Sequence, residues 1–230
     1  MSKVFADAIE IDPPGPARGS VIWLHGLGAN GHDFEPLVRQ WDLTERLSLR
    51  FVLPHAPVRP VTLNAGRSMR AWYDVSGLEF GTGEDVAGIR AAQQDIRCLI
   101  EQEQARGLDA RSILLAGFSQ GGALALFTGL RYPQPLAGIL GLSCYLPLAA
   151  TLEAEKQDCQ LQTPIRMDHG EMDPIVALRL AEVSCARIRS AGFDVAFNLY
   201  AMGHSLCLEQ IPELYRWIAA CFGVTNASSP

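Results

Sequence analysis

A serine flanked by glycines is the feature of this sequence most able to do chemistry, in the order Gly117-Phe118-Ser119-Gln120-Gly121. An apolar run over residues 112–116 precedes it, and small and aliphatic residues follow over 122–130. This pattern predicts a buried strand, a sharp turn and a closely packed helix, with glycines where neighbouring backbone leaves no room for a Cβ atom. Ser119 is then expected at a nucleophile elbow, with its hydroxyl exposed above the N-terminal end of the helix. An ordinary exposed serine in a glycine-rich turn is the alternative.

A serine hydroxyl becomes a good nucleophile only beside a base, which in turn needs a group to orient it and to stabilise its charge. His204 is the best candidate base, because it lies in a glycine-flanked loop after the last predicted strand. Asp173 is the candidate acid, since it follows the strand between the serine and the histidine. The resulting order, serine then aspartate then histidine, is typical of α/β-hydrolases. Glu171 stays open as an alternative acid, whereas Asp168 lies within a predicted strand and Asp194 begins one.

Acyl transfer also needs hydrogen-bond donors for the oxyanion that develops on the substrate carbonyl. The backbone N–H of Gln120, directly after the serine, is one candidate donor, and the N–H of Leu27 is the other. His25 precedes Leu27 and ends a strand, so we expect it to brace the loop that holds this N–H. Neither a metal nor another cofactor is predicted, because metal-ligand spacing is lacking among the other histidines before the last loop, His32, His55 and His169.

Strands and helices alternate along the chain, which predicts an α/β fold with a mostly parallel sheet and helices on both faces. The predicted strands cover residues 4–11, 20–25, 50–53, 112–116, 136–143, 164–169 and 194–200. The predicted helices cover residues 34–41, 84–104, 122–130, 175–190 and 206–221. Asp33 is the expected N-cap of the first helix. Residues 55–83 show no period, and residues 151–161 read as an exposed polar excursion. The loops holding Ser119, Asp173 and His204 should converge where the parallel strands end.

Length and composition limit the possible classes of protein. The 230 residues suit a single domain over 1–230 with a frayed tail over 224–230, and 48% hydrophobic residues suffice for a large core. The net charge of −6 argues against nucleic acid and anionic membrane surfaces as partners. The sequence shows no signal peptide and no stretch of transmembrane length, so stable membrane insertion is not expected. Six scattered cysteines favour reduced thiols and a cytoplasmic location, and disulfides in an exported protein are the alternative.

Four motifs in the chain resemble those of the phospholipase/carboxylesterase family, which includes acyl-protein thioesterases and bacterial carboxylesterases. They are His25-Gly26-Leu27-Gly28, Gly117-Phe118-Ser119-Gln120-Gly121-Gly122, His169-Gly170-Glu171-Met172-Asp173-Pro174-Ile175-Val176 and Gly203-His204-Ser205. Residues 54–62, 71–74 and 142–148 extend the match over nearly the whole chain. The resemblance implies an α/β-hydrolase fold without a large cap domain. It also implies Ser119 as nucleophile, His204 as base and Asp173 as orienting acid, with Leu27 and Gln120 supplying the oxyanion N–H groups.

The activity expected from these motifs is that of a serine carboxylesterase or thioesterase that forms an acyl-enzyme. Its partners would be small-molecule or lipid acyl esters, or acylated proteins. Acyl-protein thioesterase and lysophospholipase both stay open as the main activity, and a non-catalytic binding protein of the same fold is a remote alternative. A dienelactone hydrolase would favour cysteine at the position of Ser119. No stretch demands a stable oligomer, so a monomer or a weak homodimer is expected.

Two further features concern the surroundings of the expected site. Trp72 is favoured as a wall of the acyl pocket, with Leu63 and Leu146 as weaker candidates. Arg166 and Asp168 stand before His169 where the family pattern has apolar residues. An extra carboxylate so close to the acid loop puts the pH optimum in question more than the mechanism.

Overall fold

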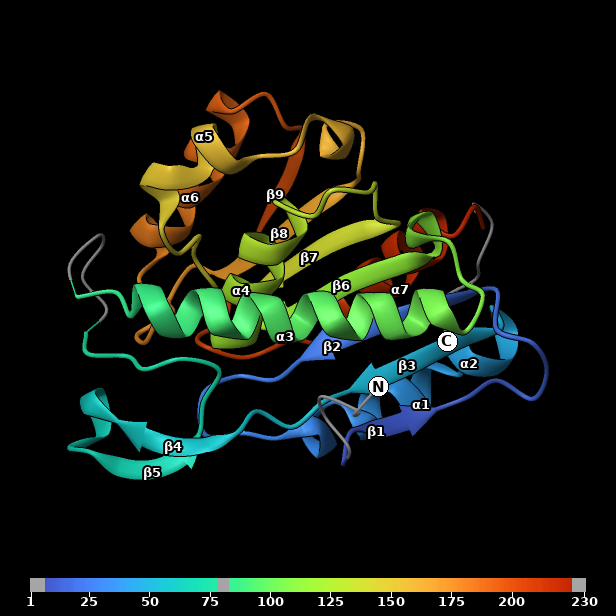
Figure 1. Ribbon diagram of the computed structural model, residues 1–230, viewed down its shortest axis with the longest axis horizontal. Helices are drawn as coiled ribbons and strands as arrows, with labels where there is room; N and C mark the ends of the chain where they lie inside the picture. Colours follow the sequence, from blue (N-terminus) through green and yellow to red (C-terminus); the bar gives the residue numbers. More distant parts are fainter. Residues whose placement is uncertain (1–6, 78–82, 225–230) are drawn as a thin grey trace.

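A mostly parallel sheet forms the centre of the computed structural model, which describes residues 7–77 and 83–224 (Figure 1). Its strands are β1 (Ile9–Ile11), β2 (Gly19–Leu24), β3 (Leu49–Leu53), β6 (Ile113–Phe118), β7 (Gly138–Leu142), β8 (Ile165–Gly170) and β9 (Val195–Tyr200). They lie in the order β1-β3-β2-β6-β7-β8-β9. The edge strand β1 pairs antiparallel with β3, and each of the other pairs is parallel. The predicted α/β-hydrolase architecture is therefore confirmed.

Helices follow most of the strands, as the alternating pattern predicts. They are α1 (Glu35–Trp41), α2 (Leu43–Arg46), α3 (Val86–Ala105), α4 (Gln120–Gly129), α5 (Leu152–Glu155), α6 (Leu178–Ser190) and α7 (Gln210–Cys221). Short 3-10 helices are η1 (Gly31–Asp33), η2 (Thr62–Asn64), η3 (Ala110–Ser112), η4 (Ala149–Thr151) and η5 (Asp158–Gln160). The segment between β7 and β8 holds only short helical turns, and no large cap domain interrupts the described residues.

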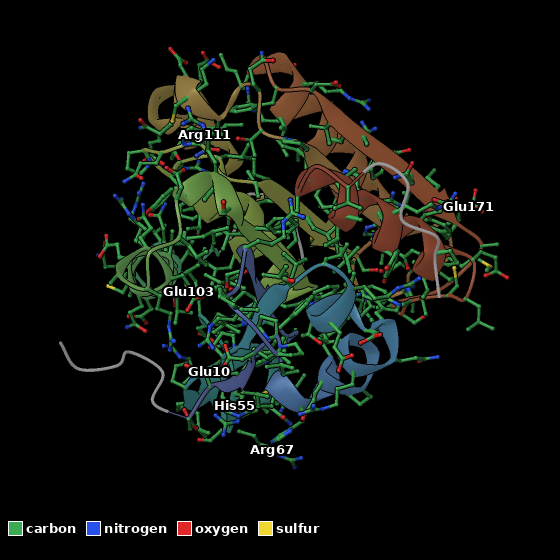
Figure 2. The ribbon with its side chains drawn as sticks, turned by 90° about the vertical axis from the view of Figure 1, so that its right-hand side faces the viewer. Glu10, His55, Arg67, Glu103, Arg111 and Glu171 are labelled. Atoms are coloured by element: carbon green, nitrogen blue, oxygen red, sulfur yellow. The ribbon has the colours of Figure 1, made fainter. Side chains whose placement is uncertain are left out.

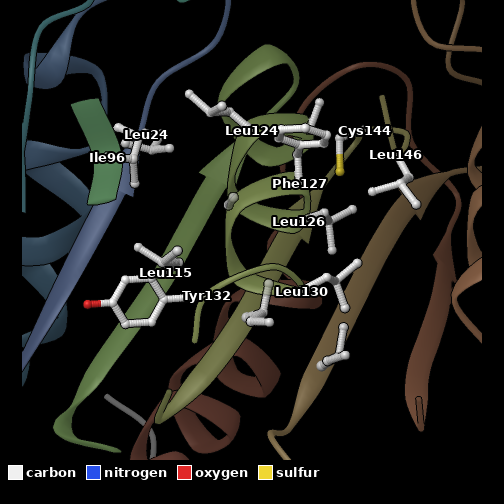
Figure 3. Packing of buried hydrophobic residues seen from close by; sticks show 14 of the residues in the cluster. Leu24, Ile96, Leu115, Leu124, Leu126, Phe127, Leu130, Tyr132, Cys144 and Leu146 are labelled. Carbon is white, nitrogen blue, oxygen red and sulfur yellow. The ribbon is translucent and has the colours of Figure 1, made fainter. Parts of the chain in front are cut away.

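The sheet lies between two helical layers, each with its own apolar cluster. On one face, α3 and α4 cover the sheet (Figure 1), and Ile96 of α3 and Leu124 of α4 belong to the same apolar cluster as Leu115 of β6 (Figure 3). On the other face, α1 and α7 pack against side chains that include Leu114, the preceding residue of β6. Successive side chains of a strand point to opposite faces, so these two leucines serve different clusters. The two layers hold the carboxyl ends of the parallel strands at one edge of the sheet. The loops that hold Ser119, Asp173 and His204 begin at this edge.

Several predicted boundaries differ from the structure in ways that have local causes. The first strand begins at Ile9 rather than at residue 4, and residues 4–6 lie outside the described part of the chain. The helix predicted over 175–190 begins at Leu178, because the preceding residues form a turn around Asp173. The helix predicted from residue 206 begins at Gln210. The predicted tail from 224 falls almost wholly outside the described residues, which end at 224.

Residues 55–83 are more ordered than predicted. They contain the hairpin of β4 (Val58–Val61) and β5 (Arg67–Arg70), which stands apart from the central sheet (Figure 1). Each strand of the hairpin is only four residues long, and neither alternates between apolar and polar residues, so the sequence pattern does not predict them. Backbone hydrogen bonds fix them from outside, including one of 2.8 Å from the N–H of Gly28 to the carbonyl of Arg70.

Two other expectations are wrong. Asp33 makes no capping hydrogen bond to α1, whose N-cap is Phe34, and instead ends the short helix η1. Residues 151–161 are not simply an exposed excursion, because Leu152 and Gln160 within them are fully buried. The Gln160 side chain accepts a 3.2 Å hydrogen bond from the N–H of Leu136 and so ties this segment to the approach to β7.

In the part of the chain that the structure describes, no helix combines the length and the apolar character needed to cross a membrane. The six cysteines are free thiols.

Candidate active site

Ser119 occupies a strained turn between β6 and α4. Its backbone has φ 54° and ψ −120°, outside the regions that non-glycine residues favour. A Cβ atom on Gly117 would collide with the backbone of Gly121, and one on Gly121 would collide with the carbonyl oxygen of Leu24. The N–H of Ser119 donates a 2.8 Å hydrogen bond to the carbonyl of Leu142. The turn is thus held by close backbone contacts that only glycine permits, as the sequence predicts.

The side chains of Ser119, His204 and Asp173 form one hydrogen-bonded chain. The Oγ of Ser119 lies 2.9 Å from Nε2 of His204, in position to donate its proton to that nitrogen. On the other side of the ring, Nδ1 of His204 lies 2.7 Å from Oδ2 of Asp173. The residues come from the ends of β6, β9 and β8, which the parallel sheet brings to one edge.

Asp173 is fixed from two directions. Its Oδ1 accepts hydrogen bonds of 2.9 Å from the backbone N–H groups of Ile175 and Val176. Its other oxygen, Oδ2, faces His204 and also lies 3.5 Å from Nε2 of His169. His169 in turn donates 2.8 Å to the carbonyl of Val176. The carboxylate is completely buried, so these donors replace the water it would otherwise bind.

The competing carboxylates lie elsewhere. Glu171 is exposed and is labelled at the periphery of Figure 2. Asp194 is exposed and precedes β9, so it lies at the opposite end of that strand from His204. Asp168 is buried within β8, where it is bound by other side chains. Of the four candidate acids, the structure brings Asp173 into contact with His204.

The histidine loop and the acid loop are joined to each other. The N–H of Glu171 donates to the carbonyl of Tyr200, and the N–H of Met172 donates to that of Met202, at 2.9 and 3.1 Å. Phe118 supports the imidazole of His204 from a third side, with ring centroids 4.8 Å apart. These contacts hold the imidazole ring between the acid and the serine.

The loop after β2 carries Leu27 beside Ser119. His25 braces it as expected: its Nδ1 donates 2.7 Å to the carbonyl of Gly26, and its Nε2 accepts 2.9 Å from the N–H of Ala56. Burial lowers the pKa of His25 from 6.5 to about 4. The imidazole is therefore neutral at pH 7, which its acceptor role toward Ala56 requires.

Gln120 links the elbow to the long connection after β3. Its side-chain oxygen accepts 3.0 Å from the N–H of Trp72, and its side-chain nitrogen donates 2.8 Å to the carbonyl of Tyr73. Its backbone N–H belongs to the first residue of α4, where such groups have no carbonyl partner within the helix. Leu27, in the loop after β2, and Gln120, at the start of α4, both line the same cavity as Ser119.

An apolar cavity of about 190 Å³ opens beside Ser119. It is lined by Leu27, Leu63, Tyr73, Val75, Ser119, Gln120, Tyr145, Ile175, Val176 and His204. Leu63 thus lies where the sequence suggested. Trp72 and Leu146 are not among the residues that line this cavity, and each is only 1% exposed. The indole of Trp72 donates 2.8 Å to the carbonyl of His25, and Leu146 packs in the core cluster of Figure 3.

Sequence reasoning missed most of the cavity wall. Tyr73 and Tyr145 stand next to Trp72 and Leu146, and Ile175 and Val176 follow the acid after one proline. Their place in the motifs was the available signal. Which side chain of a motif turns toward a cavity depends on packing that spacing does not record.

Arg166 and Asp168, the departure from the family pattern, form part of a buried polar network. Arg166 donates to both oxygens of Asp168, at 2.8 and 3.0 Å. Asn198 of β9 and Gln210 of α7 donate to the same carboxylate, at 2.8 and 2.9 Å. The network therefore joins the strand before the acid loop to the strand and the helix that flank the histidine loop.

Within residues 7–77 and 83–224, no three histidine, cysteine, aspartate or glutamate side chains gather as a metal site would require.

Comparison with known proteins gives consistent results over most of the chain. A family model described as phospholipase/carboxylesterase matches residues 7–222. Acyl-protein thioesterase 1 of Neurospora crassa is 40% identical over 212 residues, which are 87% of this chain and 86% of that protein. Carboxylesterase SOBER1 of Arabidopsis thaliana is 33% identical over 205 residues, covering 88% of this chain and 90% of the relative.

Solved structures agree. The crystal structure of Arabidopsis thaliana SOBER1 has a TM-score of 0.84 at 32% identity and covers 89% of this chain and 99% of its own. That of Zea mays acyl-protein thioesterase 2 has a TM-score of 0.82 at 28% identity, covering 94% and 99%. These matches confirm the resemblance seen in the motifs: the chain belongs to the phospholipase/carboxylesterase family.

Proposed function

We propose that this protein hydrolyses acyl esters and thioesters through a covalent acyl-enzyme formed on Ser119. As a member of its family, the chain is a carboxylic ester hydrolase. The observation that carries the finer proposal is the hydrogen-bonded chain from Ser119 Oγ through His204 to the buried carboxylate of Asp173. This is the geometry in which a serine is activated by a base and the base is oriented by an acid.

In the first half-reaction, Oγ of Ser119 attacks the carbonyl carbon of the substrate and its proton passes to Nε2 of His204. Asp173 stabilises the imidazolium and keeps the proton-bearing Nδ1 turned toward itself. The N–H groups of Leu27 and Gln120 hold the negative charge on the tetrahedral oxygen, which typically lowers the barrier by about 3 kcal/mol for each donor. The intermediate collapses when His204 returns the proton to the leaving oxygen or sulfur, and the acyl group stays on Ser119.

In the second half-reaction, water replaces the departed group. His204 takes a proton from the water as its oxygen attacks the acyl carbon, and the same two N–H groups hold the new oxyanion. The proton then returns to Oγ of Ser119 as the bond to the acyl group breaks. The carboxylic acid leaves, and the enzyme regains its starting protonation state.

The apolar cavity supports an acyl chain as the bound part of the substrate. Its walls carry leucine, valine, isoleucine and tyrosine side chains, and no carboxylate or cationic side chain is among the described residues that line it. Two relatives are named acyl-protein thioesterase 1 and another is named carboxylesterase. We therefore propose acylated proteins or lipid esters as natural substrates, with acyl-protein thioesterase as the main activity.

The test is hydrolysis of p-nitrophenyl esters by the wild type and by Ser119→Ala. Removing the nucleophile should lower kcat/KM by about 10³ or more. Ser190→Ala is the matched control, because Ser190 is exposed on α6 and its hydroxyl donates to the carbonyl of Ala186 in the same helix. A fluorophosphonate should label the wild type and the control but not Ser119→Ala. Retention of most esterase activity in Ser119→Ala would overturn the proposal.

A further inference from the structure

A second cavity, of about 370 Å³, meets the apolar cavity at Ser119. Leu27, Ser119 and His204 line both. The remaining wall comes from the η1–α1 junction, the end of β6 and the loop after His204, and it includes Asp33, Phe34, Phe118, Ser205 and Leu206. The reacting hydroxyl and the imidazole therefore stand at the junction of two spaces with different linings.

We infer that the second cavity receives the leaving group of the substrate, and that Asp33 selects leaving groups that carry a positive charge. This inference rests on the proposed function, because it assigns the two sides of the same acyl-transfer centre. It adds a specificity determinant that is not among the residues proposed to carry out the chemistry.

The assignment of the two sides follows from the geometry of acyl transfer. In the tetrahedral intermediate, the acyl chain and the leaving atom are separate substituents of the carbon bound to Ser119, so they point in different directions. His204 must reach the leaving atom to protonate it, and its ring lines both cavities. An alkyl chain placed against Asp33 would desolvate a carboxylate without offering it a partner, which is costly. The acyl chain therefore fits the apolar cavity, and the leaving group occupies the second cavity.

Asp33 is available to a ligand because no described residue binds its carboxylate. It does not cap α1, contrary to the sequence expectation. Among the residues that the structure describes, its carboxylate has no ion-pair or hydrogen-bond partner, and its charge acts on the buried His25 without direct contact. Its backbone N–H donates to the carbonyl of Asn30 at 3.1 Å. By contrast, its acidic neighbour Glu35 is engaged by both His32 and Arg39.

The rest of the wall also favours a cation. Phe34 and Phe118 lie beside each other with ring centroids 6.2 Å apart, and aromatic faces attract alkylammonium and guanidinium groups. No lysine or arginine is among the described residues that line this cavity, so no permanently cationic side chain there would attract an anionic leaving group. The fitting chemistry is thus an ammonium or guanidinium group a few bonds from the scissile oxygen or sulfur.

The experiment measures kcat/KM for paired butyrate esters. One member of each pair carries a trimethylammonium group, and the other carries a tert-butyl group of nearly the same shape. Spacers of two, four and six methylenes allow for the reach to Asp33. The cationic ester should be preferred by roughly fivefold to tenfold at the best spacer, with the preference shrinking in high salt. Asp33→Asn should bring the ratio to about one, and Asp33→Lys should invert it.

Asp194→Asn is the matched control, because it removes another exposed carboxylate, which precedes β9 and so lies at the other end of the strands from the site, and it should keep the wild-type ratio. A ratio near one in the wild type at all spacers, with both esters hydrolysed, overturns the inference and leaves the proposed function standing. So does a preference that Asp33→Asn and Asp194→Asn reduce equally, since that reports net charge alone. Failure of the wild type to hydrolyse any ester overturns the proposed function as well.

Discussion

Asp173 illustrates how much a single side chain depends on its immediate donors. One of its oxygens is occupied by two backbone N–H groups, so the other is left facing the imidazole of His204. An amide in place of the carboxylate would keep the size of the side chain but would turn an NH₂ group toward either the backbone donors or the ring. Both orientations disturb the tautomer in which Nε2 is free to accept the proton of Ser119.

Asp173→Asn should therefore lower kcat by about 10⁴ with little change in KM, because the cavities that bind substrate are intact. Steady-state kinetics on a p-nitrophenyl ester provide the measurement. Glu171→Gln is the control, since Glu171 is the neighbouring carboxylate that the sequence left open and is exposed in the structure. A larger loss of kcat in Glu171→Gln than in Asp173→Asn would show that Asp173 is not the acid that orients His204.

At the scale of elements, the buried network around Asp168 determines how β8, β9 and α7 are held together. Arg166 and Asp168 belong to β8, Asn198 to β9 and Gln210 to α7. The acid loop follows β8, and the histidine loop runs from β9 to α7. Where relatives are expected to have apolar packing, this chain connects the same elements through hydrogen bonds and through the ion pairs of Arg166 with Asp168 and Glu213.

Asp168→Asn should destabilise the fold by about 3 kcal/mol, because it removes the countercharge of Arg166, whose side chain is only 8% exposed. Glu213→Gln, which removes a second and half-exposed acidic partner of Arg166, should cost less than about 1 kcal/mol. Urea denaturation of the two variants gives the comparison. Equal losses in both would mean that the buried carboxylate contributes no more than a surface ion pair.

For the molecule as a whole, the parts predictable from sequence are those with a strong period or a backbone constraint. The side chains of the core strands point alternately into two apolar clusters, and the turn at Ser119 needs glycine at two positions. The core strands and this turn were therefore both visible in the residue pattern. The β4–β5 hairpin was not, because its strands are short, lack an alternating pattern and are bonded to a distant segment at Gly28. The walls of the two cavities were not either. Trp72 is buried as a brace of the His25 loop, and Asp33 faces a cavity instead of capping a helix.

The free energy of unfolding should depend on pH in a way that reflects the protonation of His25. Burial lowers its pKa from 6.5 to about 4, so between these values the unfolded chain binds a proton that the folded protein excludes. The stability that depends on a neutral His25 is therefore present above pH 6.5 and is lost as the pH falls toward 4. From pH 7 to pH 5 this amounts to about 2 kcal/mol of unfolding free energy. Burial and nearby Arg70 also lower the pKa of His55, labelled in Figure 2, which adds in the same direction.

Urea denaturation at pH 7, 6 and 5 tests this, over a range in which most carboxylates stay ionised. His25→Asn should be less stable than the wild type at pH 7 but should lose less stability on acidification, since the excluded proton has gone. His32→Asn is the control, because His32 is 67% exposed, and it should keep the wild-type slope. If the unfolding free energy of His25→Asn fell with pH as steeply as that of the wild type, His25 would not be the source of the pH dependence. Both His25 and His55 accept a backbone N–H near the Leu27 loop, so a reduced slope would tie acid sensitivity to the segment that flanks Ser119.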